Sequence, residues 1–183
     1  MDIAWDITFI IINASVLILC IVAFKNVKAK NLLDKAKSSE NKGTKPKALY
    51  YLDKALEKSP QDINIISRKA VLLRDMGNYD EAIEYYNIAL VLAQDANTLA
   101  TINYHLAVLY CNLGKYNESK GRFDNAMSQE NSSNDEFWNN LGILYYHLND
   151  KSEALRCFDK ALSINPQSMA KSNRASLLSE IQK

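Results

Sequence analysis

The side chains best suited to chemistry in this sequence are two histidines and three cysteines, and their spacing assembles no reactive site. His105 and His147 lie far apart, and neither has a cysteine or carboxylate at a spacing that indicates a catalytic triad or a metal-ligand set. Cys20, Cys111 and Cys157 are widely spaced and odd in number, so they predict neither a disulfide framework nor a zinc site. We interpret both imidazoles as non-catalytic and the thiols as buried or lining a groove.

Phosphate-binding and acid–base chemistry have no better support. No glycine-rich loop follows a predicted strand, which argues against a nucleotide site of that kind. Asp80, Glu81 and Glu153 follow tight turns near predicted helix starts, where carboxylates oppose the helix dipole and need no catalytic role. We therefore expect a protein that is not an enzyme and binds no cofactor or metal.

The composition favours packed helices and argues against nucleic-acid binding. Apolar residues make up 48% of the 183 residues, while five glycines and three prolines are too few for a loop-rich β fold. Residues 1–24 carry a charge of −2, and residues 25–60 carry +6 because ten lysines face four carboxylates. The net charge of +1 therefore leaves −3 for the remainder, which is not a nucleic-acid-binding charge pattern.

Residues 7–24 form an uncharged, mainly apolar run that follows a short N-terminal segment, residues 1–6. At about 1.5 Å per residue a helix of this length nearly crosses a hydrocarbon layer of ~30 Å, and Trp5 is placed as an interfacial aromatic. A cleavable signal peptide would need a basic leading segment, and a lipoprotein signal at Cys20 would need a small residue in place of Leu19. We therefore expect a transmembrane helix, with an exported or lipid-anchored protein as the alternative.

A basic segment, residues 25–47, follows the apolar run and sets the expected orientation. The lysines follow the apolar run, whereas the segment before it carries only acidic charges. This distribution predicts a single-pass membrane protein with its N-terminus outside and the rest of the chain in the cytoplasm. Lys25, Lys28 and Lys30 are interpreted first as a topology signal, and a sharper hypothesis adds contact with anionic lipid. No glycine or proline occurs between Asp2 and Lys42, so we expect one nearly continuous helix with at most a bend near residues 25–30.

Residues 135–166 carry the pattern of a tightly packed helical hairpin. The first helix presents Trp138, Leu141, Gly142 and Tyr145 on one face, and the second presents Ala154, Phe158 and Ala161 before Pro166. Small residues let the two helices approach, so that Trp138, Tyr145 and Phe158 fill the grooves between them. This pattern resembles the tetratricopeptide repeat, a helical hairpin of 34 residues.

Weaker copies precede this hairpin. We expect a degenerate first repeat at residues 29–62 and further repeats at 63–96, 100–133 and 135–168, followed by a capping helix at 169–183. The first is degenerate because Lys35 and Ser39 stand where the family has apolar residues. Equivalent small residues are 34, 37 and 35 positions apart, and we expect the extra residues in polar turns near 94–98 and 132–134. The cap should turn Ala175, Leu178 and Ile181 toward the last hairpin.

The predicted fold class is therefore all-α: one transmembrane helix, then a superhelix of about three to four repeats and a capping helix. The resemblance implies a concave groove lined by the first helix of each hairpin, and so implies a peptide-binding set. That set is Asn64, Ser67, Val71, Arg74, Tyr104, His105, Val108, Cys111, Asn139, Asn140, Ile143, Tyr146, Asn173 and Arg174. Some family members clamp an acidic chaperone tail with Lys, Asn and Arg, but no register here holds that full set.

We therefore expect a membrane-anchored adaptor or scaffold that binds peptides or helices of other proteins in this groove. An alternative is a receptor or assembly factor for protein targeting or translocation at a membrane, which apolar groove residues such as Tyr104, Val108 and Ile143 would favour. The residue pattern predicts no oligomeric state.

Overall fold

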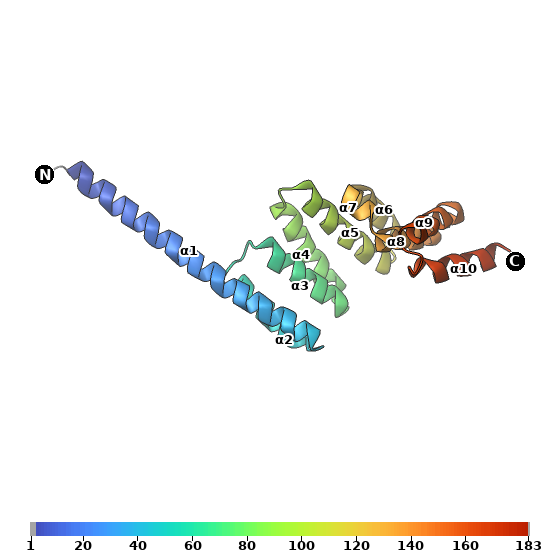
Figure 1. Ribbon diagram of the computed structural model, residues 1–183, viewed down its shortest axis with the longest axis horizontal. Coiled ribbons are helices and arrows are strands. Elements are labelled where there is room, and N and C mark those ends of the chain that lie inside the picture. The colour runs from blue at the N-terminus through green and yellow to red at the C-terminus, as the bar shows by residue number, and fades with distance from the viewer. Residues whose placement is uncertain (1–2, 183) are drawn as a thin grey trace. The chain divides into compact units, whose positions relative to one another are not determined.

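The computed structural model describes residues 3–182, and within them the side chains of residues 14–128 and 131–182. All regular secondary structure in this described part is helical (Figure 1). The helices are α1 (Ile3–Asn41), α2 (Lys45–Leu56), α3 (Ile63–Asp75), α4 (Tyr79–Leu92), α5 (Ala96–Asn112), α6 (Tyr116–Ala126), α7 (Gln129–Ser132), α8 (Asp135–His147), α9 (Lys151–Ile164) and α10 (Ala170–Ile181). The chain divides into two compact units, the first ending at Leu72 and the second beginning at Leu73.

The turns after α1, α3, α5 and α8 share one backbone conformation. A residue with positive φ follows each of these helices, namely Gly43 (71°), Gly77 (83°), Gly114 (73°) and Asn149 (61°). Its N–H bonds to the carbonyl three residues back, and the next N–H bonds to the carbonyl five residues back. Glycine and asparagine tolerate this left-handed conformation best. The same turn therefore closes all four hairpins, including the hairpin of the degenerate first repeat.

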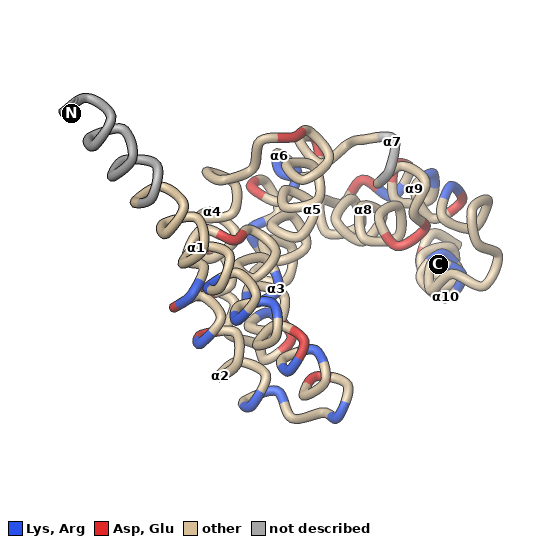
Figure 2. Tube along the Cα trace, turned by 60° about the vertical axis from the view of Figure 1, so that its left-hand side comes forward, with Lys and Arg blue, Asp and Glu red and all other residues tan. Residues whose placement is uncertain are grey.

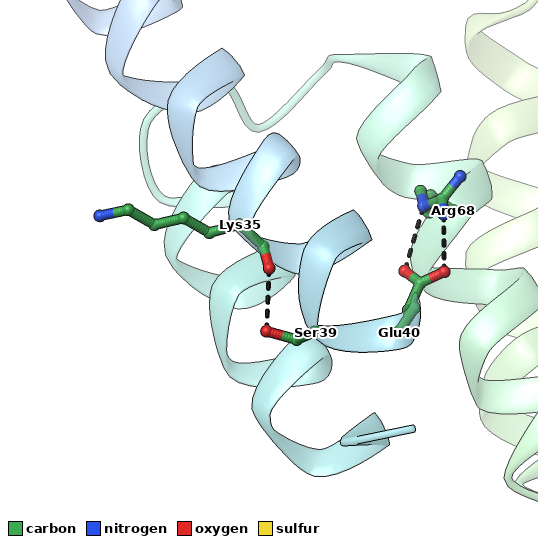
Figure 3. A network of polar contacts seen from close by, with 4 residues as sticks. All are labelled: Lys35, Ser39, Glu40 and Arg68. Atoms are coloured by element: carbon green, nitrogen blue, oxygen red, sulfur yellow. Dashed lines mark hydrogen bonds and ion pairs between the residues drawn. The ribbon is translucent and has the colours of Figure 1, made fainter. Parts of the chain in front are cut away.

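In the first unit, α1 and α2 form an antiparallel hairpin over the second half of α1. Ala29, Ala36 and Ser39 are buried on α1, opposite buried Ala48, Leu52 and Ala55 on α2. Ser39 avoids an unsatisfied hydroxyl because its Oγ donates to the Lys35 carbonyl oxygen at 2.9 Å (Figure 3). Lys35 is exposed at the edge of the hairpin, and its Nζ lies 5.9 Å from the ring centre of Tyr51 on α2, so the two departures from the family pattern are accommodated. The predicted continuous helix is confirmed, because α1 runs unbroken to Asn41.

Two ion pairs hold the start of α3 against this hairpin. Arg68 donates to both carboxylate oxygens of Glu40 on α1, at 3.0 and 2.7 Å (Figure 3). Lys69 Nζ lies 2.7 Å from Asp53 Oδ1 on α2, although the Lys69 side chain is only 8% exposed. A buried lysine is costly unless it is paired, so these contacts fix the orientation of α3.

The first half of α1 is exposed wherever its side chains are described. Every described side chain from Ala14 to Lys28 is exposed, including Val16, Leu17, Ile18 and Leu19 at 51–68%. Within the described residues no helix is long and apolar enough to cross a membrane. Residues 7–13 of the predicted span lie outside the part whose side chains are described. Lysines and arginines then gather along the second half of α1 and on α2 (Figure 2).

In the second unit, neighbouring helices pack in chain order from α4 to α10, with the short helix α7 beside α8. Aromatic rings fill its centre: Tyr104, Phe123, Phe137 and Trp138 contact one another with ring centroids 5.6–6.2 Å apart. The Trp138 indole N–H donates to the Ser132 carbonyl at 2.9 Å, which satisfies the polar end of a buried ring.

The small residues of the last hairpin act as the sequence predicts. A Cβ added to Gly142 would lie 2.6 Å from Phe158 Cε1 and 2.7 Å from its Cδ1, and Phe158 is only 2% exposed. Ala154 and Ala161 are fully buried on α9. Only glycine at position 142 therefore lets α8 lie this close to the Phe158 ring.

The extra residues between repeats lie partly in turns, at residues 93–95 and 133–134, and partly in helices. Helix α5 begins at Ala96, and Asp95 caps it by accepting from the Thr98 N–H at 2.9 Å. After α6, the chain forms α7 before α8. The expected polar turns are therefore present but shorter than predicted, and the Asp95 cap favours the early start of α5.

The cap helix α10 is present, but its predicted inner face is wrong. Ala170 and Leu177 are buried, whereas Ala175 and Ile181 are exposed. Polar contacts turn the helix to this angle: Asn173 donates to Asn139 on α8, and Arg174 pairs with Asp159 on α9. A short helix whose five apolar residues are spread around its circumference does not fix its own orientation.

Candidate protein-binding faces

A groove between α1 and α3 lies within the first unit, with a volume of about 760 Å³. It is lined by Asn26, Lys30, Leu33, Lys37 and Glu40 from α1, and by Asp62, Asn64, Ile65, Ser67, Arg68 and Val71 from the start of α3. The α1 residues recur every three or four positions and so form one stripe along the helix. This α1–α3 groove brings together three of the predicted peptide-binding residues, Asn64, Ser67 and Val71.

The charges in the α1–α3 groove are partly neutralised by internal contacts. Arg68 and Glu40 bond to each other, and the Asp62 carboxylate accepts from the Asn64 N–H at 2.9 Å. Lys30 and Lys37 are exposed and form no ion pair within the described part of the chain. Apolar Leu33 and Val71 are half-buried between these polar groups. The groove can therefore offer apolar contacts and two free cations to a peptide.

In the second unit, predicted groove residues bond to one another across successive hairpins. Asn140 Nδ2 donates to the Tyr104 hydroxyl at 2.8 Å, and Asn173 Nδ2 donates to Asn139 Oδ1 at 2.8 Å. Tyr104 is 8% exposed and Asn139 is 6% exposed. These side chains therefore join the stacked helices, and little of their polar surface faces outward.

A third cross-hairpin contact joins Arg74 to His105. Arg74 Nη1 lies 3.3 Å from His105 Nδ1, while the same guanidinium also donates to Asp75. The His105 ring stacks on Tyr86 with centroids 5.4 Å apart. Burial, helped by the Arg74 charge, lowers the pKa of His105 to about 4. The imidazole is therefore neutral near pH 7 and held in place as a packing group.

A pocket of about 300 Å³ lies between α8 and α10. Its lining is Ile143, Tyr146, His147, Phe158, Asn173, Ser176, Leu177 and Glu180. The Tyr146 hydroxyl donates to Glu180 Oε1 at 3.0 Å, and this bond to a carboxylate raises the pKa of Tyr146. This α8–α10 pocket contains predicted Ile143, Tyr146 and Asn173. Sequence reasoning missed Ser176 and Glu180 because their side of α10 depends on the helix orientation described above.

The remaining predicted groove residues lie elsewhere. Val108 and Cys111 are half-buried against the aromatic core of the second unit. Arg174 faces α9, where its Nε donates to Asp159. Burial raises the pKa of the Cys111 thiol and brings that of Cys157 to about 11, so neither thiol is activated as a nucleophile. No cluster of metal-ligating side chains occurs among the described residues.

Two segments match family models described as tetratricopeptide repeat, residues 66–100 and residues 136–168. Among solved structures, PilF of Pseudomonas aeruginosa is similar over 86% of this chain and 71% of its own, with 20% identity and a TM-score of 0.74.

A MamA fragment from Desulfovibrio magneticus RS-1 covers 85% of this chain and 92% of its own at 14% identity, with a TM-score of 0.68. A tetratricopeptide repeat protein from Parabacteroides merdae covers 85% of this chain and 60% of its own at 24% identity, with a TM-score of 0.67. Comparison with curated proteins gives no match. Identities this low indicate a shared fold and do not transfer a function.

Proposed function

Because this chain belongs to the tetratricopeptide repeat family, we propose that it is an adaptor that binds an extended segment of a partner protein in its α1–α3 groove while α1 anchors it to a membrane. Tetratricopeptide repeats are protein-interaction modules, and the fold supports such a role in general. The observation that carries the proposal is the α1–α3 groove, which combines free cations with apolar side chains.

The first unit is favoured over the second as the site of partner binding because its polar groups are still available. Asn64 and Ser67 line an open groove. In the second unit, by contrast, Asn140 bonds to Tyr104, and Asn139 bonds to Asn173. A partner that replaced those internal bonds would gain little, since it would exchange one hydrogen bond for another.

Membrane anchoring is supported by the first half of α1. A helix that is apolar on every side is normally covered by protein or by lipid, and every side chain of residues 14–24 is exposed. The sequence extends this uncharged run back to residue 7, so eighteen residues would span ~27 Å as a helix. The lysines that begin at Lys25 favour a cytoplasmic location for the repeats.

Anchoring would help a weak groove to work. Confining the α1–α3 groove to a membrane surface raises its effective concentration toward membrane partners, so a modest affinity suffices.

In-cell photo-crosslinking tests the groove. A photoreactive residue at Ser67 should capture a partner, whereas one at exposed Glu84 on α4 should not. Val71→Trp, which fills the groove, should abolish the Ser67 adduct. Capture from Glu84 alone, or a Ser67 adduct that survives Val71→Trp, would remove the groove from the proposal.

Alkaline extraction of membranes tests the anchor separately. The full chain should remain in the membrane pellet, and replacing Leu17 and Ile21 together by lysine should release it. A wild-type chain found in the supernatant would exclude anchoring while leaving the groove result intact.

A further inference from the structure

A second cavity beside α1, of about 400 Å³, combines three lysines with three apolar side chains. Its lining is Cys20, Ile21, Phe24, Lys25 and Lys28 from α1, and Lys58 from the loop between α2 and α3. We call it the lysine cavity. It contains no acidic side chain, and none of its three lysines forms an ion pair within the described part of the chain.

The fold brings Lys58 to this place from a distant part of the sequence. Helix α2 runs back along α1 and ends at Leu56, so the following loop lies beside residues 20–28. Ser59 Oγ donates to Asn26 Oδ1 at 3.1 Å and ties this loop to α1. The loop carries two acidic residues: Glu57 pairs with Lys54 at 2.6 Å, and Asp62 accepts from the Asn64 N–H at 2.9 Å. Neither lines the lysine cavity or forms an ion pair with Lys58 within the described part of the chain.

The lysine cavity lies where the uncharged run of α1 ends. Ile21 and Phe24 are exposed on its apolar side, and Lys28 Nζ lies 4.3 Å from the Phe24 ring centre, so this lysine folds back toward the apolar segment. Lys30 lies elsewhere, because it lines the α1–α3 groove. The sequence-based hypothesis assigns lipid contact to Lys25, Lys28 and Lys30. In the structure Lys58 takes the place of Lys30 in this set.

We propose that Lys25, Lys28 and Lys58 bind the phosphate of an anionic phospholipid in the lysine cavity, with the first part of its acyl chain against Ile21 and Phe24. This inference rests on the proposed membrane anchor. A free phosphate would use only the cationic half of the cavity, whereas a phospholipid matches both halves. The bound lipid turns the α2–α3 loop toward the bilayer and so orients the first unit.

Native mass spectrometry of the full chain released from detergent micelles tests the proposal. The wild type should retain phosphatidylglycerol more strongly than phosphatidylcholine. Lys58→Gln should reduce phosphatidylglycerol retention by about fivefold, as expected for one lysine near anionic headgroups. Lys47→Gln, which removes an equal charge at an exposed site on α2, should leave retention unchanged.

Three outcomes would overturn the lipid site: equal retention of the two lipids, equal retention by wild type and Lys58→Gln, or complete displacement of phosphatidylglycerol by inorganic phosphate. Flotation with neutral phosphatidylcholine vesicles separates this result from the anchor itself. A chain that floats but shows no lipid preference keeps its anchor and loses the lysine cavity as a site. A chain that does not float loses both.

Discussion

Replacing Gly142 by alanine should destabilise the second unit, although alanine is the better helix former. The added Cβ would lie 2.6 and 2.7 Å from two carbons of the Phe158 ring and 3.1 Å from a third. Overpacking of this kind costs about 1–3 kcal/mol, and the buried ring has little room to move. Alanine returns about 1 kcal/mol of helix propensity. The expected net loss in the free energy of unfolding is therefore about 1 kcal/mol, and at most about 2 kcal/mol.

Gly121 provides the matched control. It lies within α6, and nothing stands within 4 Å of the Cβ that a side chain would add there. Gly121→Ala should therefore raise the free energy of unfolding by about 1 kcal/mol through helix propensity alone. The two glycine-to-alanine substitutions thus have opposite expected signs.

Urea unfolding followed by circular dichroism at 222 nm measures both variants. In a Phe158→Leu background, which removes the Cε1 and Cζ carbons, the cost of Gly142→Ala should fall by at least half. If Gly142→Ala were as stabilising as Gly121→Ala, or if its cost were unchanged by Phe158→Leu, the close approach of α8 to Phe158 would be wrong.

Three further predictions concern the second unit. The pKa of His105 falls from 6.5 to about 4 on folding, so the unfolded state binds more protons between these values, and lowering the pH from 7 to 5 should reduce the free energy of unfolding by about 2 kcal/mol. Urea titrations at the two pH values measure this loss, and His105→Gln should abolish it. Asn139→Ala should cost about 1–2 kcal/mol, since it removes the acceptor of Asn173, while Asn173→Ala added to it should cost little more. Asn149→Gly should stabilise the chain by a few tenths of a kcal/mol, since φ is 61° there; a lower thermal midpoint would contradict this.

The sequence predicts best those features that depend on neighbours within one hairpin. Gly142 and Phe158 together predict the packing of the last hairpin, because a large ring on one helix needs a small residue opposite it when the two helices lie close together. The continuous α1 follows from the absence of glycine and proline between Asp2 and Lys42.

Features that depend on how separate elements meet were not readable from the sequence. The hydrogen bonds between Asn139 and Asn173, and between Tyr104 and Asn140, join residues more than thirty positions apart. The sequence therefore predicts amides available to a peptide, whereas the structure shows that they bond to each other's hairpins. The orientation of α10 depends on the same contacts. Lys58 reaches the lysine cavity only because α2 returns along α1, which no local pattern around Lys58 indicates.

Because α1 is unbroken, the directions of its two lining stripes, one in the α1–α3 groove and one in the lysine cavity, are fixed relative to each other. Each residue turns an α-helix by about 100°, so the stripe from Asn26 to Glu40 and the stripe from Cys20 to Lys28 lie about half a turn apart. No glycine or proline lies between them to absorb a twist. The angular register of α1 therefore makes the α1–α3 groove open on the side opposite the lysine cavity. A single residue inserted after Phe24 would rotate the apolar side of the lysine cavity by about 100° relative to Lys25 and Lys28. The α1–α3 groove, whose α1 residues all follow the insertion, would keep its lining.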